Sequence, residues 1–203
     1  MHPQFNVSTI SLSFSYRFIL IDVGSYGRQS DGGIFSRSGF GRALANNQLN
    51  LPPDRKISEN SPTLPNVFVG DVAFPLGYHL MRPYPGRNLT EQKTIFNYRL
   101  SRARRVVENA FGILSQRFRV FLRRIAVGVD SIDNIIKCAC CLHNFLLDDS
   151  TATTSREIET DCPLSDLDNI GGNSSVAAQA VRDTFATYFL TDGRVSWQDA
   201  FNE

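Results

Sequence analysis

The sequence predicts a mixed α/β fold, and three features of its hydrophobic pattern support that prediction. Residues 7–14 alternate apolar and hydroxyl side chains, and residues 17–23 form a nearly continuous apolar run, so both are expected to be strands. Residues 67–71 make a third short run with β-branched side chains, typical of a buried strand. Residues 90–117 and 130–147 instead place apolar side chains three and four positions apart, which is the spacing of amphipathic helices.

The N-terminal part is predicted to contain a β-hairpin followed by short helices. Only two residues separate the first two strands, which favours a tight antiparallel connection. Residues 24–33 are rich in glycine and polar side chains and are expected to form a loop. A short helix is predicted after Asp31, an acceptable N-cap, and a second over residues 39–48. The proline-rich residues 51–65 are expected to connect these helices to the third strand.

The two long helices have clear start signals and predicted core faces. Thr90 is a good N-cap for the first helix, and Asp130 or Ser131 can cap the second. The core positions expected on the first helix are Ile95, Leu100, Ala103, Val107, Ala110, Phe111 and Leu114. Those expected on the second helix are Ile132, Ile135, Ile136, Ala139, Leu142 and Phe145.

The end of the chain differs in composition from the rest. Residues 149–175 are rich in Ser, Thr, Asp, Asn and Gly and are predicted to be a flexible acidic linker. Residues 176–203 regain a helical pattern and then form a tail, whose single tryptophan, Trp197, is expected to dock on the domain. The length of 203 residues fits one domain of ordinary size with such a tail.

The net charge of +1 conceals a strong asymmetry along the chain. Residues 93–124 contain nine Lys and Arg and one acid, whereas residues 148–203 contain eleven acids and three arginines. A basic segment favours a polyanionic partner such as nucleic acid, and the alternative is a helix with a solvated charged face. No apolar stretch approaches the roughly 20 residues that span a bilayer, so we expect no membrane partner.

Four residues on the second long helix invite a zinc hypothesis. Cys138, Cys140, Cys141 and His143 lie within six positions. Zinc needs four ligands that converge tetrahedrally, whereas these positions point in nearly all directions around one helix. The cysteines are therefore predicted to be reduced thiols buried in the core of an intracellular protein.

Two carboxylates, Asp71 and Glu108, are the first candidates for catalysis. Asp71 ends the predicted third strand, and Glu108 lies within the arginine-rich helix. Carboxylates on separate elements can hold Mg²⁺ or Mn²⁺, which assist the cleavage of phosphodiesters. The alternative is a surface aspartate and a helix glutamate that form ion pairs with Arg104 and Arg105.

Several strings along the chain carry a family resemblance. They are residues 16–35, Gly70-Asp-Val-Ala-Phe-Pro-Leu76, Arg82-Pro-Tyr-Pro-Gly86, residues 96–114 around Glu108, Cys138-Ala-Cys-Cys-Leu-His-Asn-Phe-Leu146, and residues 181–189 with Trp197. In this order they resemble the nuclease domain of Harbinger-type (PIF/Harbinger) transposases and their domesticated relatives. The resemblance implies a DDE superfamily endonuclease with a ribonuclease H-like mixed sheet flanked by helices, and makes residues 1–148 its partial nuclease domain.

The resemblance also implies roles for single residues. Asp71 matches the second acid of the metal-binding DDE triad and Glu108 the third, whereas the first acid has no match before residue 10. We therefore expect an N-terminally truncated domain that lacks its first core strand. Asp22, which is predicted to end the second strand, is a candidate substitute, and the alternative is that it only finishes the hairpin.

The expected function follows from these assignments. The resemblance implies a divalent-metal-dependent DNA endonuclease, impaired by loss of the first ligand, that acts in the nucleus with DNA and a separate DNA-binding protein as candidate partners. The candidate phosphate contacts are Arg99, Arg102, Arg104 and Arg105. The alternatives are a catalytically silent DNA- or protein-binding module and a non-functional fragment.

Overall fold

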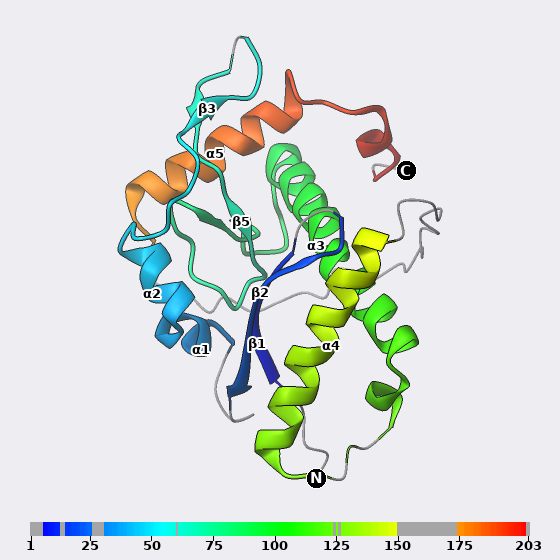
Figure 1. The fold of residues 1–203 in the computed structure, drawn as a ribbon. Coiled ribbons are helices and arrows are strands. Elements are labelled where there is room, and N and C mark those ends of the chain that lie inside the picture. Colours follow the sequence, from blue (N-terminus) through cyan, green and yellow to red (C-terminus); the bar gives the residue numbers. More distant parts are fainter. Residues whose placement is uncertain are drawn as a thin grey trace. The chain divides into compact units, whose positions relative to one another are not determined.

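The computed structural model describes residues 6–12, 15–25, 31–59, 61–123, 125, 127–149 and 174–201. Helices and two-stranded sheets occur together in these residues (Figure 1), which confirms the mixed α/β prediction. The chain divides into two compact units. The first unit comprises Met1–Ile34 and Arg105–Pro163, and the second comprises Phe35–Arg104 and Leu164–Glu203. The long helix α3 (Glu91–Arg117) contributes residues to both units.

The first unit contains the predicted hairpin. Strands β1 (Asn6–Leu12) and β2 (Phe18–Ser25) pair antiparallel, with register shifts near both ends of β1. Tyr16, in the connection, has a φ angle of 62°, in the left-handed region that a reversal of chain direction can require. β2 continues two residues beyond the predicted end at residue 23.

Helix α4 (Val129–Asp149) lies along β2 in this unit (Figure 1). Between α3 and α4 the chain forms the short 3₁₀ helix η1 (Arg119–Leu122). Asn144 of α4 binds both backbone groups of Phe18: its Oδ1 accepts from the Phe18 N–H at 2.9 Å, and its Nδ2 donates to the Phe18 carbonyl at 2.8 Å. The buried core of the unit consists of Phe18, Ala110, Leu114, Ile132, Ile136, Ala139 and Cys140.

The core face of α4 differs in part from the prediction. Ile132, Ile136 and Ala139 are buried as expected, but Leu142 is exposed and Phe145 is 68% exposed. Cys140 and His143 fill the interior instead. The sequence offers two apolar stripes on this helix, and packing against β2 buries only one of them.

The second unit combines short strands with helices. Its elements are α2 (Gly39–Ala45), β3 (Arg55–Lys56), β4 (Thr63–Leu64), β5 (Phe68–Val69), β6 (Leu80–Met81), the first part of α3, α5 (Val176–Leu190) and the 3₁₀ helix η2 (Ser196–Phe201). β3 pairs antiparallel with β4, and β5 pairs parallel with β6. Helix α1 (Asp31–Arg37) begins at Asp31, one residue earlier than predicted, so Asp31 lies in its first turn and is not its N-cap. The last residues of α1 belong to this unit.

The main core of the second unit lies between α5, α3 and the segment around β6. It contains Leu64, Leu76, Met81, Tyr84, Phe96, Leu100, Ala178, Val181, Phe185 and Ala186. A smaller aromatic cluster joins Phe35 and Phe40 to Phe68 and Phe74 through edge-to-face contacts.

The predicted helix at the C-terminal end of the chain is confirmed as α5. Ala103, which was expected in the core of α3, is exposed.

The third strand is shorter and more exposed than the sequence predicts. The prediction of a buried strand over residues 67–71 is wrong in extent and burial, because β5 covers only Phe68 and Val69, and Val69 is 37% exposed. Phe68 packs into the aromatic cluster, so the alternation of a strand turns Val69 outward.

Some expectations concern residues that lie outside the described ones. Residues 26–30 of the predicted glycine-rich loop and residues 150–173 of the predicted acidic linker belong to this group. Across the described part of the chain, every helix is too short or too polar to cross a lipid bilayer.

Candidate functional site

Asp71 lies in a tight turn directly after β5, in the second unit. The chain reaches it through Gly70, whose N–H donates to the Met81 carbonyl at 2.8 Å and extends the pairing with β6. A β-carbon on Gly70 would lie 3.0 Å from that of Phe74, so the turn fits glycine best here. The Asp71 Oδ1 accepts from the Ala73 N–H at 2.8 Å, and its carbonyl accepts from the Phe74 N–H at 3.2 Å. A backbone donor of the turn therefore holds one oxygen of this carboxylate in place.

The second oxygen of Asp71 faces a cation. Arg104 Nη2 lies 3.7 Å from Asp71 Oδ2, and the two side chains are 35% and 31% exposed, respectively. The separation is at the long end of the range for an ion pair, and both partners are reached by water. Such a pair contributes little to stability, so the carboxylate is held in place mainly by its turn.

A buried arginine supports the same turn. Arg82 follows β6 and lies within hydrogen-bond distance of two turn carbonyls, 3.5 Å from Val72 and 3.3 Å from Phe74. Burial, together with the nearby Arg182, lowers the pKa of the Arg82 guanidinium from its usual value. The sequence places Arg82 in a motif of the family resemblance but does not predict this supporting role, although a charged residue directly after the apolar pair Leu80-Met81 is a usable signal.

Two arginines of α3 contact the C-terminal segment. Arg99 donates to the Gly193 carbonyl at 2.5 Å and to Gln198 Oε1 at 3.3 Å. Burial lowers the pKa of Arg99 from its usual value. Arg102 is exposed and stacks on Trp197, with 4.3 Å between the guanidinium carbon and the ring centroid. Arg99 is thus engaged within the protein, whereas Arg102 presents its guanidinium group at the surface.

The remaining predicted site residues belong to the first unit. Glu108 is exposed on α3, and Arg105, three residues before it, is half-buried. Asp22 is half-buried in β2, opposite Thr9 in the register with β1. The sequence predicted that Asp22 ends the second strand. This is wrong, because β2 continues to Ser25 and Asp22 lies within the strand. The described residues contain no group of three or more His, Cys, Asp or Glu side chains arranged to hold a metal ion.

The histidine and cysteines of α4 separate into buried and exposed groups. His143 is fully buried, and its Nε2 donates to the Tyr16 carbonyl at 3.0 Å, which makes this the protonated nitrogen of the neutral ring. Burial is the main reason why the pKa of His143 is lowered from its usual value. Cys140 is buried and its pKa is raised to about 11, chiefly by burial, whereas Cys138 and Cys141 are exposed. The prediction of core thiols thus holds for Cys140 and is wrong for the other two.

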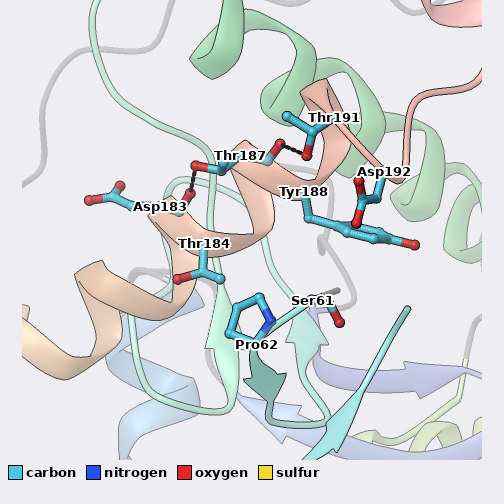
Figure 2. Close-up of a pocket in the computed structure, with 8 residues that line it drawn as sticks. All are labelled: Ser61, Pro62, Asp183, Thr184, Thr187, Tyr188, Thr191 and Asp192. Atoms are coloured by element: carbon cyan, nitrogen blue, oxygen red, sulfur yellow. Dashed lines mark hydrogen bonds between the residues drawn. The ribbon is translucent and has the colours of Figure 1, made fainter. Parts of the chain in front are cut away.

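The second unit also contains an open groove of about 590 Å³ along α5. Figure 2 shows its lining residues, Ser61, Pro62, Asp183, Thr184, Thr187, Tyr188, Thr191 and Asp192. The three threonine hydroxyls donate to carbonyls one turn earlier on the helix. Both carboxylates accept hydrogen bonds, Asp183 from Tyr84 at 2.5 Å and Asp192 from Ser58 at 3.1 Å. These threonine hydroxyls and carboxylates are thus all hydrogen-bonded within the protein.

Comparison with known proteins identifies the family to which the chain belongs. Residues 7–144 match the family described as DDE superfamily endonuclease. The chain is also 29% identical over 133 residues to "Protein ALP1-like" from Arabidopsis thaliana. That match covers 65% of this chain and 32% of the relative, so the chain spans about a third of that protein's length. No solved structure matches the chain. Because the family match extends over more than half of the sequence, the chain belongs to the DDE superfamily endonuclease family.

Proposed function

We propose that this chain is a transposase-derived, divalent-metal-dependent DNA endonuclease domain of the Harbinger type, built on a ribonuclease H-like fold. The observation that carries the proposal is Asp71, a carboxylate whose orientation is fixed by its own turn and whose Oδ2 faces a cationic side chain. The family match and the Harbinger-like motifs support the same assignment.

The candidate ligands have the donor chemistry that Mg²⁺ or Mn²⁺ requires. Both ions prefer carboxylate oxygens, and Asp71, Glu108 and Asp22 supply them. Asp71 is the best prepared of the three, since its Oδ1 is held by a backbone N–H and its Oδ2 has only the long Arg104 contact. When bound, the metal would activate a water molecule and stabilise the leaving oxygen of the phosphodiester.

The arginines of α3 would bind the DNA backbone. Guanidinium groups pair well with phosphate oxygens, and Arg102 and Arg105 carry no carboxylate partner among the described residues. Arg104 would neutralise Asp71 before metal binding and pair with phosphate afterwards. Arg99 was also a sequence candidate, and its contacts to Gly193 and Gln198 favour a role in positioning the C-terminal segment.

We further propose that cleavage by this chain is weak. Only Asp71 and Glu108 match the family's acids by motif, and phosphoryl-transfer catalysis depends on accurate ligand placement. The second candidate function is a catalytically silent DNA-binding module, which the exposed guanidinium of Arg102 favours because electrostatic binding of a DNA backbone needs no metal ligand. We also propose that the chain acts in the nucleus, together with a separate DNA-binding protein.

Cleavage of a labelled DNA duplex in Mn²⁺ or Mg²⁺ tests the proposed function. We expect slow, metal-dependent nicking by the wild type and background levels for Asp71→Asn and Glu108→Gln. Asp22→Asn shows whether that residue is a third ligand. The matched control is Glu91→Gln, which removes an exposed carboxylate from the first turn of the same helix.

Metal binding and DNA binding separate the two candidate functions. Calorimetric Mn²⁺ binding that is lost in both Asp71→Asn and Glu108→Gln supports the endonuclease. Salt-sensitive duplex binding without metal binding or nicking would leave the silent DNA-binding module. Nicking that survives both substitutions would refute the assignment of these acids.

A further inference from the structure

The surface where α3 meets the C-terminal segment combines an exposed aromatic ring with arginines. Trp197 of η2 is 39% exposed, and its ring centroid lies 4.3 Å from the guanidinium carbon of Arg102 and 5.4 Å from that of Arg99. Tyr98 contacts the indole edge-on, with 6.0 Å between ring centroids. We call the exposed pair of Trp197 and Arg102 the Trp197 platform.

The platform is held in place by a buried network beneath it. Gln198, next to Trp197, is almost fully buried, and its Nε2 donates to the Phe189 carbonyl at 3.0 Å. Its Oε1 accepts from Arg99 and from the Val195 N–H, both at 3.3 Å. Arg99 in turn lies 4.2 Å from the Phe189 ring centroid. The indole is therefore fixed in position before any ligand arrives, which reduces the entropy cost of binding.

The platform carries the positive charge of Arg102. Arg102 makes one hydrogen bond, to the Tyr98 hydroxyl at 3.4 Å, and across the described residues neither it nor Arg99 forms an ion pair with a carboxylate. Stacking on an aromatic ring uses the flat face of a guanidinium and leaves its N–H donors available. Arg102 thus offers a planar surface and hydrogen-bond donors that suit an anion.

We propose that the Trp197 platform binds single-stranded DNA, with an unpaired base stacked on Trp197 and Arg102 and the adjoining phosphate paired with the Arg102 guanidinium. In a duplex, neighbouring base pairs cover the faces of each base, so only an unpaired base can stack on a side chain. The proposal rests on the proposed function as a DNA-acting domain and adds the form of DNA that this surface recognises.

The composition provides a site-specific probe, because Trp197 is the only tryptophan in the chain. The experiment is a titration of the full chain with a 12-nucleotide oligothymidylate in EDTA, followed by tryptophan fluorescence. We expect saturable quenching that weakens as salt is added. Arg102→Lys keeps the charge but removes the planar group, and should weaken binding about tenfold, within the range measured for base stacking. Arg55→Lys, an exposed arginine on β3, is the matched control and should bind like the wild type.

The outcomes distinguish this inference from the proposed function. Absence of quenching, or equal affinity of Arg102→Lys and the wild type, would overturn the stacking site, whatever the cleavage assay shows. Metal-dependent nicking of a duplex with no oligothymidylate binding would leave the endonuclease intact without this site. A stacking signal in a chain that never nicks DNA would support the platform and the silent DNA-binding module together.

Discussion

Replacing Arg104 with glutamine tests whether this arginine and a metal ion compete for the same oxygen of Asp71. Arg104 Nη2 lies 3.7 Å from Asp71 Oδ2. If that oxygen is a metal ligand, the positive charge of Arg104 opposes cation binding there. Removing the charge should therefore tighten metal binding while leaving the fold intact.

The geometry sets the expected size of the effect. Two unit charges about 4 Å apart interact by roughly 1 kcal/mol in water, and a divalent ion doubles that figure. Both side chains are about one-third exposed, so salt and side-chain motion reduce the interaction to about 1 kcal/mol. We expect Mn²⁺ to bind Arg104→Gln about fivefold more tightly than the wild type. Loss of this long, solvated ion pair should change the unfolding free energy by less than about 1 kcal/mol.

Calorimetric titration with MnCl₂ at a fixed salt concentration measures the affinity. Arg102→Gln is the matched control, since it removes the same charge two residues earlier on α3, where the guanidinium stacks on Trp197. Asp71→Asn should abolish the binding. Unchanged or weaker binding in Arg104→Gln would refute the competition, and an equal gain in Arg102→Gln would show a general effect of net charge.

Three further predictions concern the first unit. Asn144→Ala should lower the unfolding free energy by about 2 kcal/mol in urea, because two part-buried backbone groups of β2 lose their partner, whereas Asn134→Ala on the exposed face of α4 should have little effect. Burial lowers the pKa of His143 in the folded state, so the unfolded chain takes up the proton first, and stability should fall as pH drops below about 6.5. His143→Gln should flatten that part of the pH profile; a slope that persists would refute the assignment. Peptide mapping after brief alkylation should find Cys138 modified and Cys140 protected, since its buried thiol has a pKa raised to about 11, and equal labelling would contradict the buried position.

Local sequence patterns were sufficient to predict the helices and strands that depend on residues close together in the chain. The hairpin, α1, α3 and α5 all follow from periodicity, caps and turn residues, which act within a few positions of each other. The candidate residues Asp71 and Glu108 likewise came from the sequence, through motif resemblance and the residue types that bind hard cations.

Contacts between distant residues explain the errors. α4 has two apolar stripes, and only packing against β2 decides that Cys140 and His143 are buried while Phe145 is exposed. Val69 was expected to be buried, but the aromatic cluster takes Phe68 and turns Val69 outward. Neither choice can be read from a window of neighbouring residues, because each depends on side chains far along the chain.

The same distinction applies to the candidate site. The sequence by itself determined the chemical inventory, namely carboxylates, an arginine-rich helix and a single tryptophan. Only the tertiary structure decided how that inventory is used: Arg104 faces Asp71, Arg99 anchors the C-terminal segment, and Arg102 stacks on Trp197. The physical reason is that residue type fixes what a group can bind, whereas charge pairing and stacking require groups from distant parts of the chain to meet within a few ångströms.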